Sequence, residues 1–511
     1  MAIIDPLINI ISTWVMQKRM HQIDLFVKYP HQVQEECFKK LLYSASKTEW
    51  GKRFEYSSIK TVDEYRNRIP IQDYETLKEY IVRTRNGEQN ILWPTEIKWF
   101  AKSSGTTSDK SKFIPVSRES LEECHFKGGK DMLSIYCHNY PNTKLFSGKG
   151  LMIGGSRKID PINEDSYSGD LSAILINELP LWTQWFRTPD LSVALMDEWE
   201  AKIEKIAEST ISEDVTNIFG VPSWTLVLIK YILEKTGKNN LLEVWPNLEL
   251  FMHGGVSFVP YREQFKKLIP SDQMHYVETY NASEGFFGIQ DSSDNLGMLL
   301  MLDYGIFYEF IPMEEIDKKF PKTLTLSEVQ TQTDYAMVIS TNGGLWRYTT
   351  GDTIQFTTLQ PYRIKVSGRT QCFINAFGEE LMVHNADKAI EEASVKTNAL
   401  VKDYTAAPLF ISEQEAGAHE WFIEFEKEPD NMELFSQVLD ESLKKINSDY
   451  EAKRHKDMAL KAPLVKAIPH GTFYNWFKSK GKLGGQNKIP RLSNDRKIAD
   501  EIIQLLAKQK F

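Results

Sequence analysis

Apolar residues recur along this chain at two spacings, and the two spacings predict both helices and strands. The range 434–443 and the range 498–506 each carry apolar residues at every third or fourth position, which places them on one face of a helix. Trp421, Ile423 and Phe425 instead alternate with residues that include two glutamates, as in a strand with one buried face. The C-terminal part is therefore predicted to mix helices with strands.

The rest of the chain combines the same two patterns. The first ninety or so residues are predicted to be mainly helical, with breaks near 29–30 and 68–70. A further helix is predicted over 119–136, with Ser117 as its N-cap. Short apolar runs that lead into turns predict buried strands; they lie at 148–155, 248–252, 274–280 and 362–366.

Length and charge narrow the class of protein. A chain of 511 residues is too long for one core and predicts two or three domains. The net charge of −9 argues against non-specific binding to nucleic acid. No Cys-x-x-Cys pair or metal-binding spacing occurs, so reduced thiols are expected at Cys37, Cys124, Cys137 and Cys372.

The N-terminal stretch 1–17 is apolar, but it contains Asp5 and lacks a basic start and a small-residue cleavage site. This pattern predicts an amphipathic helix of the mature protein rather than a signal peptide. No uncharged apolar run is long enough to cross a membrane. We therefore expect a cytoplasmic protein that binds neither membrane nor nucleic acid and is a monomer or a weak oligomer.

The segment 102–112 concentrates hydroxyl side chains, one glycine and three lysines directly after the apolar Trp99-Phe100-Ala101. Glycine permits close backbone approach, and N–H, hydroxyl and ammonium groups can converge on polyphosphate oxygens. The second glycine and Lys-Ser/Thr of a Walker loop are absent. Taken alone, the segment fits a solvated loop equally well.

Three later segments carry complementary chemistry: 280–288, 348–352 and 486–491. Beside a triphosphate, the carboxylate of Glu284 suits Mg²⁺, and that of Asp352 after a glycine suits ribose hydroxyls. The structural alternatives are a helix N-cap pairing for Glu284 and a turn acceptor for Asp352. Lys488, in a basic segment, has a solvated alternative. Together the segments describe an ATP site.

In order and spacing these segments resemble the adenylate-forming superfamily of acyl- and aryl-CoA synthetases, luciferases and adenylation domains. Within it they are most similar to the Gretchen Hagen family of acyl acid amido synthetases, from about residue 100 to about residue 492. The positions that meet the family's patterns are Ser103, Ser104, Gly105, Thr106, Lys112, Pro115, Tyr280, Ser283, Glu284, Phe287, Gly288, Ile289, Tyr348, Gly351, Asp352, Gly471, Thr472, Phe473, Gln486, Lys488, Pro490 and Arg491.

Two positions depart from the family's pattern. Asp109 stands where the family has a second glycine in its loop, and Thr349 stands where the family has arginine. Asp109 brings a negative charge to the expected phosphates, which Lys110 can offset. The departures leave the core motif residues in place but put the detailed phosphate geometry in question.

The resemblance implies the fold and its division. It implies an α/β N-terminal domain over 1–370, with mixed sheets and a β-barrel-like part flanked by helices. It also implies a small, mobile α+β domain over 371–511. A Gly-Arg turn at 368–369 should precede a hinge at Gln371.

The resemblance also implies ATP and Mg²⁺ as cofactors. The implied catalytic residues are Lys488, Glu284 and Lys112, with Glu284 as the Mg²⁺ ligand. The implied nucleotide-binding residues are Ser103, Ser104, Gly105, Thr106, Thr107, Gly255, Val256, Tyr280, Asn281, Ala282, Ser283, Asp352 and Arg369. Among apolar residues near these motifs, Val221, Trp224 and Phe286 are candidates for an acyl pocket, although plain core is the commoner role of such residues.

The activity implied by the resemblance is ATP-dependent ligation. A small carboxylic acid would be activated as an acyl-adenylate with release of pyrophosphate, and the acyl group would pass to an amine, expected to be an amino acid. Two alternatives stay open: an acyl-CoA synthetase with a thiol acceptor, and a non-catalytic adenylate-binding protein. The sequence does not identify the acid. His253, a lone histidine in an apolar run, is expected to be packed rather than catalytic.

Overall fold

A computed structural model describes most of the chain. The described residues are 16, 18–104, 111–153, 160–162, 166–179, 185–196, 199–256, 258, 261–294, 297–316, 318–370, 373–411, 416–457, 459–480 and 489–509. Four predicted site residues lie outside these ranges: Gly105, Thr106, Thr107 and Lys488. The expected helix over 1–17 (Met16 apart), Asp109 and the expected hinge at Gln371 also lie outside them.

The described N-terminal helices follow the predicted breaks. They are α2 (Met20–Lys28), α3 (Pro30–Ala45), α4 (Glu49–Arg53), α5 (Val62–Arg68) and α6 (Tyr74–Arg85). Proline starts α3, where its missing N–H costs nothing. Thr61 and Asp73 cap α5 and α6 by accepting hydrogen bonds from the backbone N–H groups of Glu64 and Thr76.

Most of the described strands belong to one mixed sheet. In spatial order they are β12 (Ile306–Pro312), β13 (Asp334–Thr341), β14 (Tyr348–Leu359), β15 (Tyr362–Arg369), β11 (Met298–Leu300), β10 (Gly285–Ile289), β9 (His275–Ala282), β8 (Leu250–His253), β7 (Val215–Gly220), β3 (Lys149–Met152) and β6 (Arg187–Thr188). Neighbours from β12 to β9 pair antiparallel, and those from β9 to β6 pair parallel. The predicted α/β class with mixed sheets is confirmed. Where a β-barrel-like part is expected, the structure has the antiparallel half of this sheet. Its edge strand is β12.

A second, four-stranded sheet carries the predicted phosphate segment. Its order is β2 (Ser111–Val116), β1 (Trp99–Ser104), β5 (Tyr167–Gly169) and β4 (Asp160–Pro161). Ser117 then caps the next helix, as predicted, by accepting from the N–H of Ser120. That helix begins with α7 (Arg118–Ser120), passes through a π-helical segment η2 (Leu121–Phe126) and continues as α8 (Lys127–Asn139).

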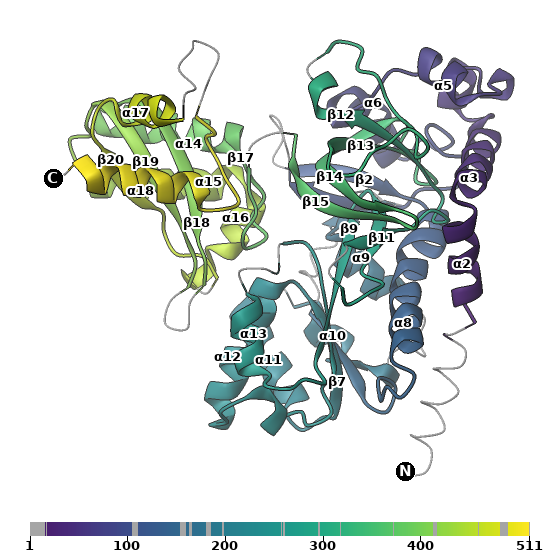
Figure 1. The fold of residues 1–511 in the computed structure, drawn as a ribbon, viewed down its shortest axis with the longest axis horizontal. Coiled ribbons are helices and arrows are strands. Elements are labelled where there is room, and N and C mark those ends of the chain that lie inside the picture. Colours follow the sequence, from purple (N-terminus) through teal and green to yellow (C-terminus); the bar gives the residue numbers. More distant parts are fainter. Residues whose placement is uncertain are drawn as a thin grey trace.

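Helices cover the parallel half of the large sheet (Figure 1). The helices in this part are α9 (Leu171–Glu178), α10 (Leu191–Ala194), α11 (Trp199–Thr210), α12 (Pro222–Thr236) and α13 (Arg262–Leu268). Among the described residues, no helix combines the length and apolar character needed to cross a bilayer. Cys37, Cys124 and Cys137 are free thiols.

The C-terminal elements form a separate group, drawn in green and yellow in Figure 1. They are β16 (Phe373–Ile374), β17 (Leu381–Met382), α14 (Val383–Thr397), β18 (Leu400–Leu409), β19 (Ala418–Lys427), α15 (Met432–Ile446), α16 (Ser448–Lys453), β20 (Leu464–Ile468), α17 (Thr472–Ser479) and α18 (Lys497–Gln509). The predicted helices and strand of this part are present, but the expectation of one buried face for the strand is wrong: β19 is buried on both faces over most of its length, because it is the central strand between β18 and β20. Mobility of the part stays a prediction.

The expected Gly-Arg turn is wrong. Gly368 and Arg369 are the last residues of β15, where they pair with Thr353 and Asp352 of β14. The strand persists because β14 offers partners up to Asp352, so the arginine is positioned by a sheet rather than by a turn.

The C-terminal group packs on the large part through a shared apolar core. One buried cluster contains residues of α12 and α13 together with residues of α14, β19 and α15. The Tyr261 hydroxyl donates to the carbonyl of Ala376 at 2.6 Å, and the Tyr261 ring lies 6.3 Å from that of Phe410. The Ser223 hydroxyl donates to the carbonyl of Phe377. In this structure the two parts therefore meet by buried contacts.

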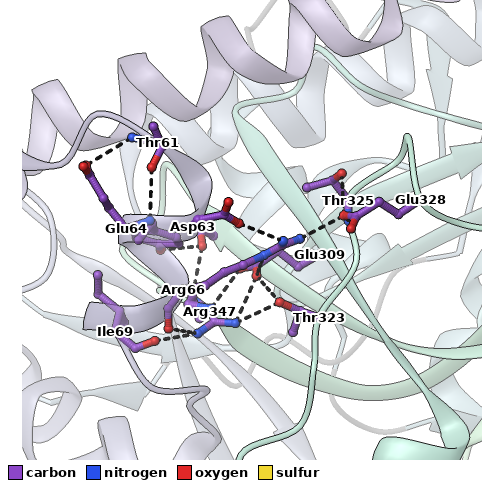
Figure 2. Close-up of polar contacts among 12 residues, drawn as sticks. Thr61, Asp63, Glu64, Arg66, Ile69, Glu309, Thr323, Thr325, Glu328 and Arg347 are labelled. Atoms are coloured by element: carbon purple, nitrogen blue, oxygen red, sulfur yellow. Dashed lines mark hydrogen bonds and ion pairs between the residues drawn. The ribbon is translucent and has the colours of Figure 1, made fainter.

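A buried ion pair fixes α5 against the antiparallel half of the sheet (Figure 2). Arg347 donates to both carboxylate oxygens of Glu309 at 3.0 Å, and the two residues are 4% and 1% exposed. Arg347 also donates to the carbonyls of Arg66 and Ile69 at the end of α5. The network joins the end of α5 to β12, which carries Glu309, and to Arg347, which directly precedes β14 and its 348–352 segment.

Candidate functional site

The predicted site residues meet at one large cavity of about 2040 Å³. It opens where the parallel strands β3, β7 and β8 end, which is the usual position of ligands in such sheets. The predicted residues that line it are Ser103, Lys112, Val221, Trp224, Gly255, Val256, Tyr280, Asn281, Ala282, Ser283, Glu284, Phe286, Asp352 and Arg369. Ser104 lies one residue further along β1, opposite Ser111.

The predicted phosphate segment starts and ends in an antiparallel pair of strands. Ser103 on β1 lies opposite Lys112 on β2, so both reach the same end of the cavity. Burial lowers the pKa of the Lys112 ammonium, and the negative charge of Glu284 acts in the opposite direction. The ammonium and this carboxylate therefore interact across the cavity.

Glu284 lies in the turn between β9 and β10. Ala282 pairs with Gly285 across this turn, and no helix follows, so the N-cap alternative for Glu284 is wrong. Burial raises the pKa of Glu284, and Lys112 partly offsets the increase. The hairpin thus holds a poorly solvated carboxylate at the cavity wall.

Asp352 is held by two side chains. Tyr280 donates its hydroxyl to one oxygen of Asp352 at 2.6 Å, and Arg369 Nε donates to the other at 2.8 Å. Asp352 and Arg369 are direct partners across β14 and β15. These bonds come from side chains rather than from the N–H groups of a turn, and they fix the orientation of Asp352, which lines the cavity.

Glycines after β8 let the chain pass close to β9. A Cβ on Gly254 would lie 2.5 Å from the carbonyl oxygen of Thr279, and Gly255 has a φ of +80°. His253, just before them, stacks on Phe258 at 4.2 Å, and burial lowers its pKa to about 3. His253 is therefore a packed, neutral residue, as expected.

Sequence reasoning missed residues that the C-terminal part brings to the cavity. Asn375, Glu380 and Lys453 all line it. The Lys453 ammonium lies 4.3 Å from the centre of the Trp224 ring, and burial lowers its pKa. Lys453 sits in a run of charged residues that gives no local signal, because its contact with Trp224 is purely tertiary.

Thr349, where the resemblance leads one to expect arginine, bonds to backbone. Its hydroxyl donates to the carbonyl of Gln72 at 3.1 Å, and its N–H donates to the same oxygen at 2.8 Å. This position therefore ties β14 to the segment before α6 and adds no positive charge to the site.

The donors near Glu284 fit a hard cation. Among the described residues, no group of three or more His, Cys, Asp or Glu side chains is arranged so that it could hold a metal ion by itself. Mg²⁺ at a nucleotide commonly takes only one or two carboxylates and fills its shell with phosphate oxygens and water. The carboxylate of Glu284, half-buried at the cavity wall beside the predicted phosphate site, meets that requirement.

Comparison with known protein families gives three consecutive matches. The GH3 family N-terminal domain matches residues 19–274, the central domain residues 299–369 and the C-terminal domain residues 384–497.

Characterised relatives match over nearly their whole length. Indole-3-acetic acid-amido synthetase GH3.3 of Arabidopsis thaliana is 22% identical, with 90% of this chain and 89% of the relative covered. The 4-substituted benzoates-glutamate ligase GH3.12 of Arabidopsis thaliana is 23% identical, with 99% of each covered. Jasmonoyl–L-amino acid synthetase JAR4 of Nicotiana attenuata is 23% identical over 96% of this chain and 95% of the relative.

Solved structures agree on the fold. The GH3.15 acyl acid amido synthetase superposes with a TM-score of 0.61 at 17% identity, covering 96% of each chain. A 2-hydroxyisobutyryl-CoA ligase in complex with 2-HIB-AMP and CoA superposes with a TM-score of 0.59 at 11% identity, covering 94% of this chain and 93% of the other.

Proposed function

The chain belongs to the GH3 family, and from that premise we propose that it is an ATP-dependent acyl acid–amido synthetase. It activates a small carboxylic acid as an acyl-adenylate and transfers the acyl group to an amino acid. The observation that carries this proposal is the convergence of Lys112, Glu284 and Asp352 on one cavity that also has apolar walls.

The first half-reaction follows from the charges in the cavity. A carboxylate oxygen of the acid attacks the α-phosphorus of ATP, an oxygen–phosphorus bond forms, and pyrophosphate leaves with the electron pair of the broken bond. Such transfers depend mainly on positioning and on neutralising the charge of the phosphate oxygens. Lys112 supplies positive charge from β2. Glu284 would hold Mg²⁺, which supplies further neutralisation when bound.

The adenosine end is assigned to the other half of the cavity. Asp352 would accept hydrogen bonds from the ribose hydroxyls, with Tyr280 and Arg369 holding its carboxylate in place. Gly255 and Val256 border the same space and would flank the base. The hydroxyls of Ser103 to Thr107 would bind phosphate oxygens, a role that extends to residues outside the described ranges.

The C-terminal part would act as a lid. We assign Lys488 to the adenylation step and 371–511 to a domain that closes over the cavity, with 1–370 as the domain that binds ATP and acid. In the second half-reaction the amine nitrogen attacks the acyl carbon, a carbon–nitrogen bond forms, and AMP leaves as the bond from carbon to phosphate oxygen breaks. The amine loses a proton in the process.

Pyrophosphate exchange tests the proposal. Labelled pyrophosphate should enter ATP only when a suitable acid is present, and added amino acids should then give an amide detectable by mass. Coenzyme A in place of the amino acid provides the contrast, since a thioester product would identify a CoA ligase. ATP binding without exchange under any acid would identify a non-catalytic adenylate-binding protein and overturn the proposal.

A further inference from the structure

The cavity extends well beyond the residues assigned to ATP. We call one part of it the apolar arm, defined as the part bordered by Phe126, Leu133, Phe146, Leu175 and Phe186. The rings of Phe146 and Phe186 lie edge to face, 6.5 Å apart. Pockets for drug-sized ligands usually measure about 300–1,000 Å³, so a cavity of about 2040 Å³ has room for more than a nucleotide and a small ring.

Two helices turn apolar faces toward this arm. Phe126, Gly129 and Leu133 are spaced by three and four residues along η2 and α8, which places them on one helix face. On α9, Leu171 and Leu175 are four apart, and both line the cavity. The arm is therefore a hollow between regular elements.

Large apolar side chains stay incompletely buried around the hollow. Phe126, Leu133, Phe146 and Leu175 are half-buried although they lie inside the fold. Protein interiors are normally close-packed, and covering the open apolar surface of a cavity with an apolar ligand is favourable.

Gly129 gives the arm its width. A Cβ added to Gly129 would meet no heavy atom within 4 Å, whereas one on the neighbouring Gly128 would lie 2.6 Å from the Phe286 ring. Glycine weakens a helix interior, so its presence at position 129 leaves open space at the expense of helix propensity.

The arm begins beside the reacting end of the site. Phe286 follows Glu284 by two residues on β10, its ring packs against Gly128, and its N–H donates to Cys124 Sγ at 3.1 Å. A carboxylate placed near Glu284 and Lys112 can therefore extend its tail past Phe286 along α8.

We propose that the apolar arm binds the tail of the acid and that the substrate class is carboxylic acids with a long, flexible apolar chain, of the fatty-acid type. This inference rests on the proposed function and specifies its acid. From Phe126 to Leu133 the helical elements extend about 10 Å, a length that suits an alkyl tail better than a single ring.

A homologous series tests the proposal. Pyrophosphate exchange is measured with butyrate, octanoate and dodecanoate, with benzoate and indole-3-acetate as ring-sized acids. Burial of each further methylene should raise kcat/KM about fourfold until the arm is full. Dodecanedioate carries a second carboxylate at the far end of its chain. It tests whether the cationic side chains of Arg187 and Lys202, which also line the cavity, bind that end.

A variant of Gly129 locates the effect. Gly129→Leu places an apolar side chain in the arm and should lower kcat/KM for dodecanoate at least tenfold, moving the preferred acid to a shorter chain. His138→Leu adds the same side chain at an exposed position of α8 and should leave the chain-length profile unchanged. Melting temperatures check folding, and Gly129→Ala provides a smaller step in the same direction.

The outcomes separate the inference from the function on which it rests. Exchange with benzoate or butyrate that does not rise with chain length overturns the long-tail substrate while leaving the synthetase assignment intact. A preference for dodecanedioate over dodecanoate also overturns it, because the arm would then bind charge. Absence of exchange with every acid overturns the proposed function itself.

Discussion

At the residue scale, Glu284 and Lys112 form a pair whose charges are poorly solvated. Burial raises the pKa of Glu284 and lowers that of Lys112, and each opposite charge works against that shift in its partner. Two poorly solvated charges are unfavourable in the absence of a ligand. Binding of a cation at Glu284 and of phosphate at Lys112 would satisfy both groups.

Glu284→Gln should therefore abolish Mg²⁺-dependent pyrophosphate exchange without unfolding the protein. In the wild type, the midpoint of the loss of activity at low pH should lie above the ordinary glutamate pKa of 4.5, since the carboxyl keeps its proton to higher pH. Excess Mg²⁺ should move that midpoint to lower pH, because metal and proton compete for one carboxylate. Glu204→Gln, on an exposed face of α11, is the control. Normal exchange in Glu284→Gln would refute the assignment.

The two bonds to the Asp352 carboxylate lead to a second expectation. Asp352→Asn removes the charge that would bind the ribose, and a hydrogen bond to a charged group contributes about 1.5–3 kcal/mol. ATP affinity measured by calorimetry should fall at least about tenfold. Tyr280→Phe, which removes only the hydroxyl that orients Asp352, should cost less. Unchanged ATP affinity in Asp352→Asn would mean that the carboxylate only holds Arg369.

At the element scale, local patterns predicted the described strands and helices well where one face is apolar. They misjudged details that depend on neighbours: Leu434 was expected on the buried face of α15 but is 41% exposed, while Phe435 is fully buried. Motif residues were identifiable because four short segments follow one another in the order and spacing of a known family. Lys453 and Glu380 were not, because only tertiary packing brings them to the cavity.

The Arg347–Glu309 pair shows how an element is held in position. Arg347→Met would leave Glu309 buried without its bidentate partner, and breaking one side of a buried pair typically costs about 3–5 kcal/mol. Unfolding in urea should report a loss of that size. The double variant Arg347→Met with Glu309→Gln should recover part of it, because the buried carboxylate, left with only Arg66 at 3.3 Å as a charged partner, is then neutral. Equal stability of the single variant and the wild type would contradict this role.

At the scale of the whole molecule, the position of the C-terminal part governs which groups reach the cavity. Asn375, Glu380 and Lys453 reach it in this structure. Lys488 follows α17 in the same C-terminal part and lies outside the described residues. A lid that changes position can offer different side chains to the two half-reactions.

Lys488→Ala should slow acyl-adenylate formation by orders of magnitude and leave ATP affinity nearly unchanged, because its ammonium would act only after closure. Conversion of chemically made acyl-adenylate to amide should be spared, since that step loses phosphate contacts. Lys480→Ala, at an exposed lysine paired with Glu501 at 2.7 Å, is the matched control. Equal loss in both half-reactions would indicate a structural role for Lys488.

The apolar core shared by α12, α13 and the C-terminal elements has a consequence for unfolding. Unfolding of either part alone would expose the shared contacts of Tyr261, Phe377 and Phe410. The wild type should therefore melt in a single calorimetric transition although it contains two parts. Tyr261→Ala should split that transition in two, while Tyr261→Phe, which removes only the bond to the Ala376 carbonyl, should keep it single. Two transitions in the wild type would show that the parts are energetically independent. A single transition would mean that the interface between the two parts, which the proposed closure would have to rearrange, also carries the cooperativity of the whole chain.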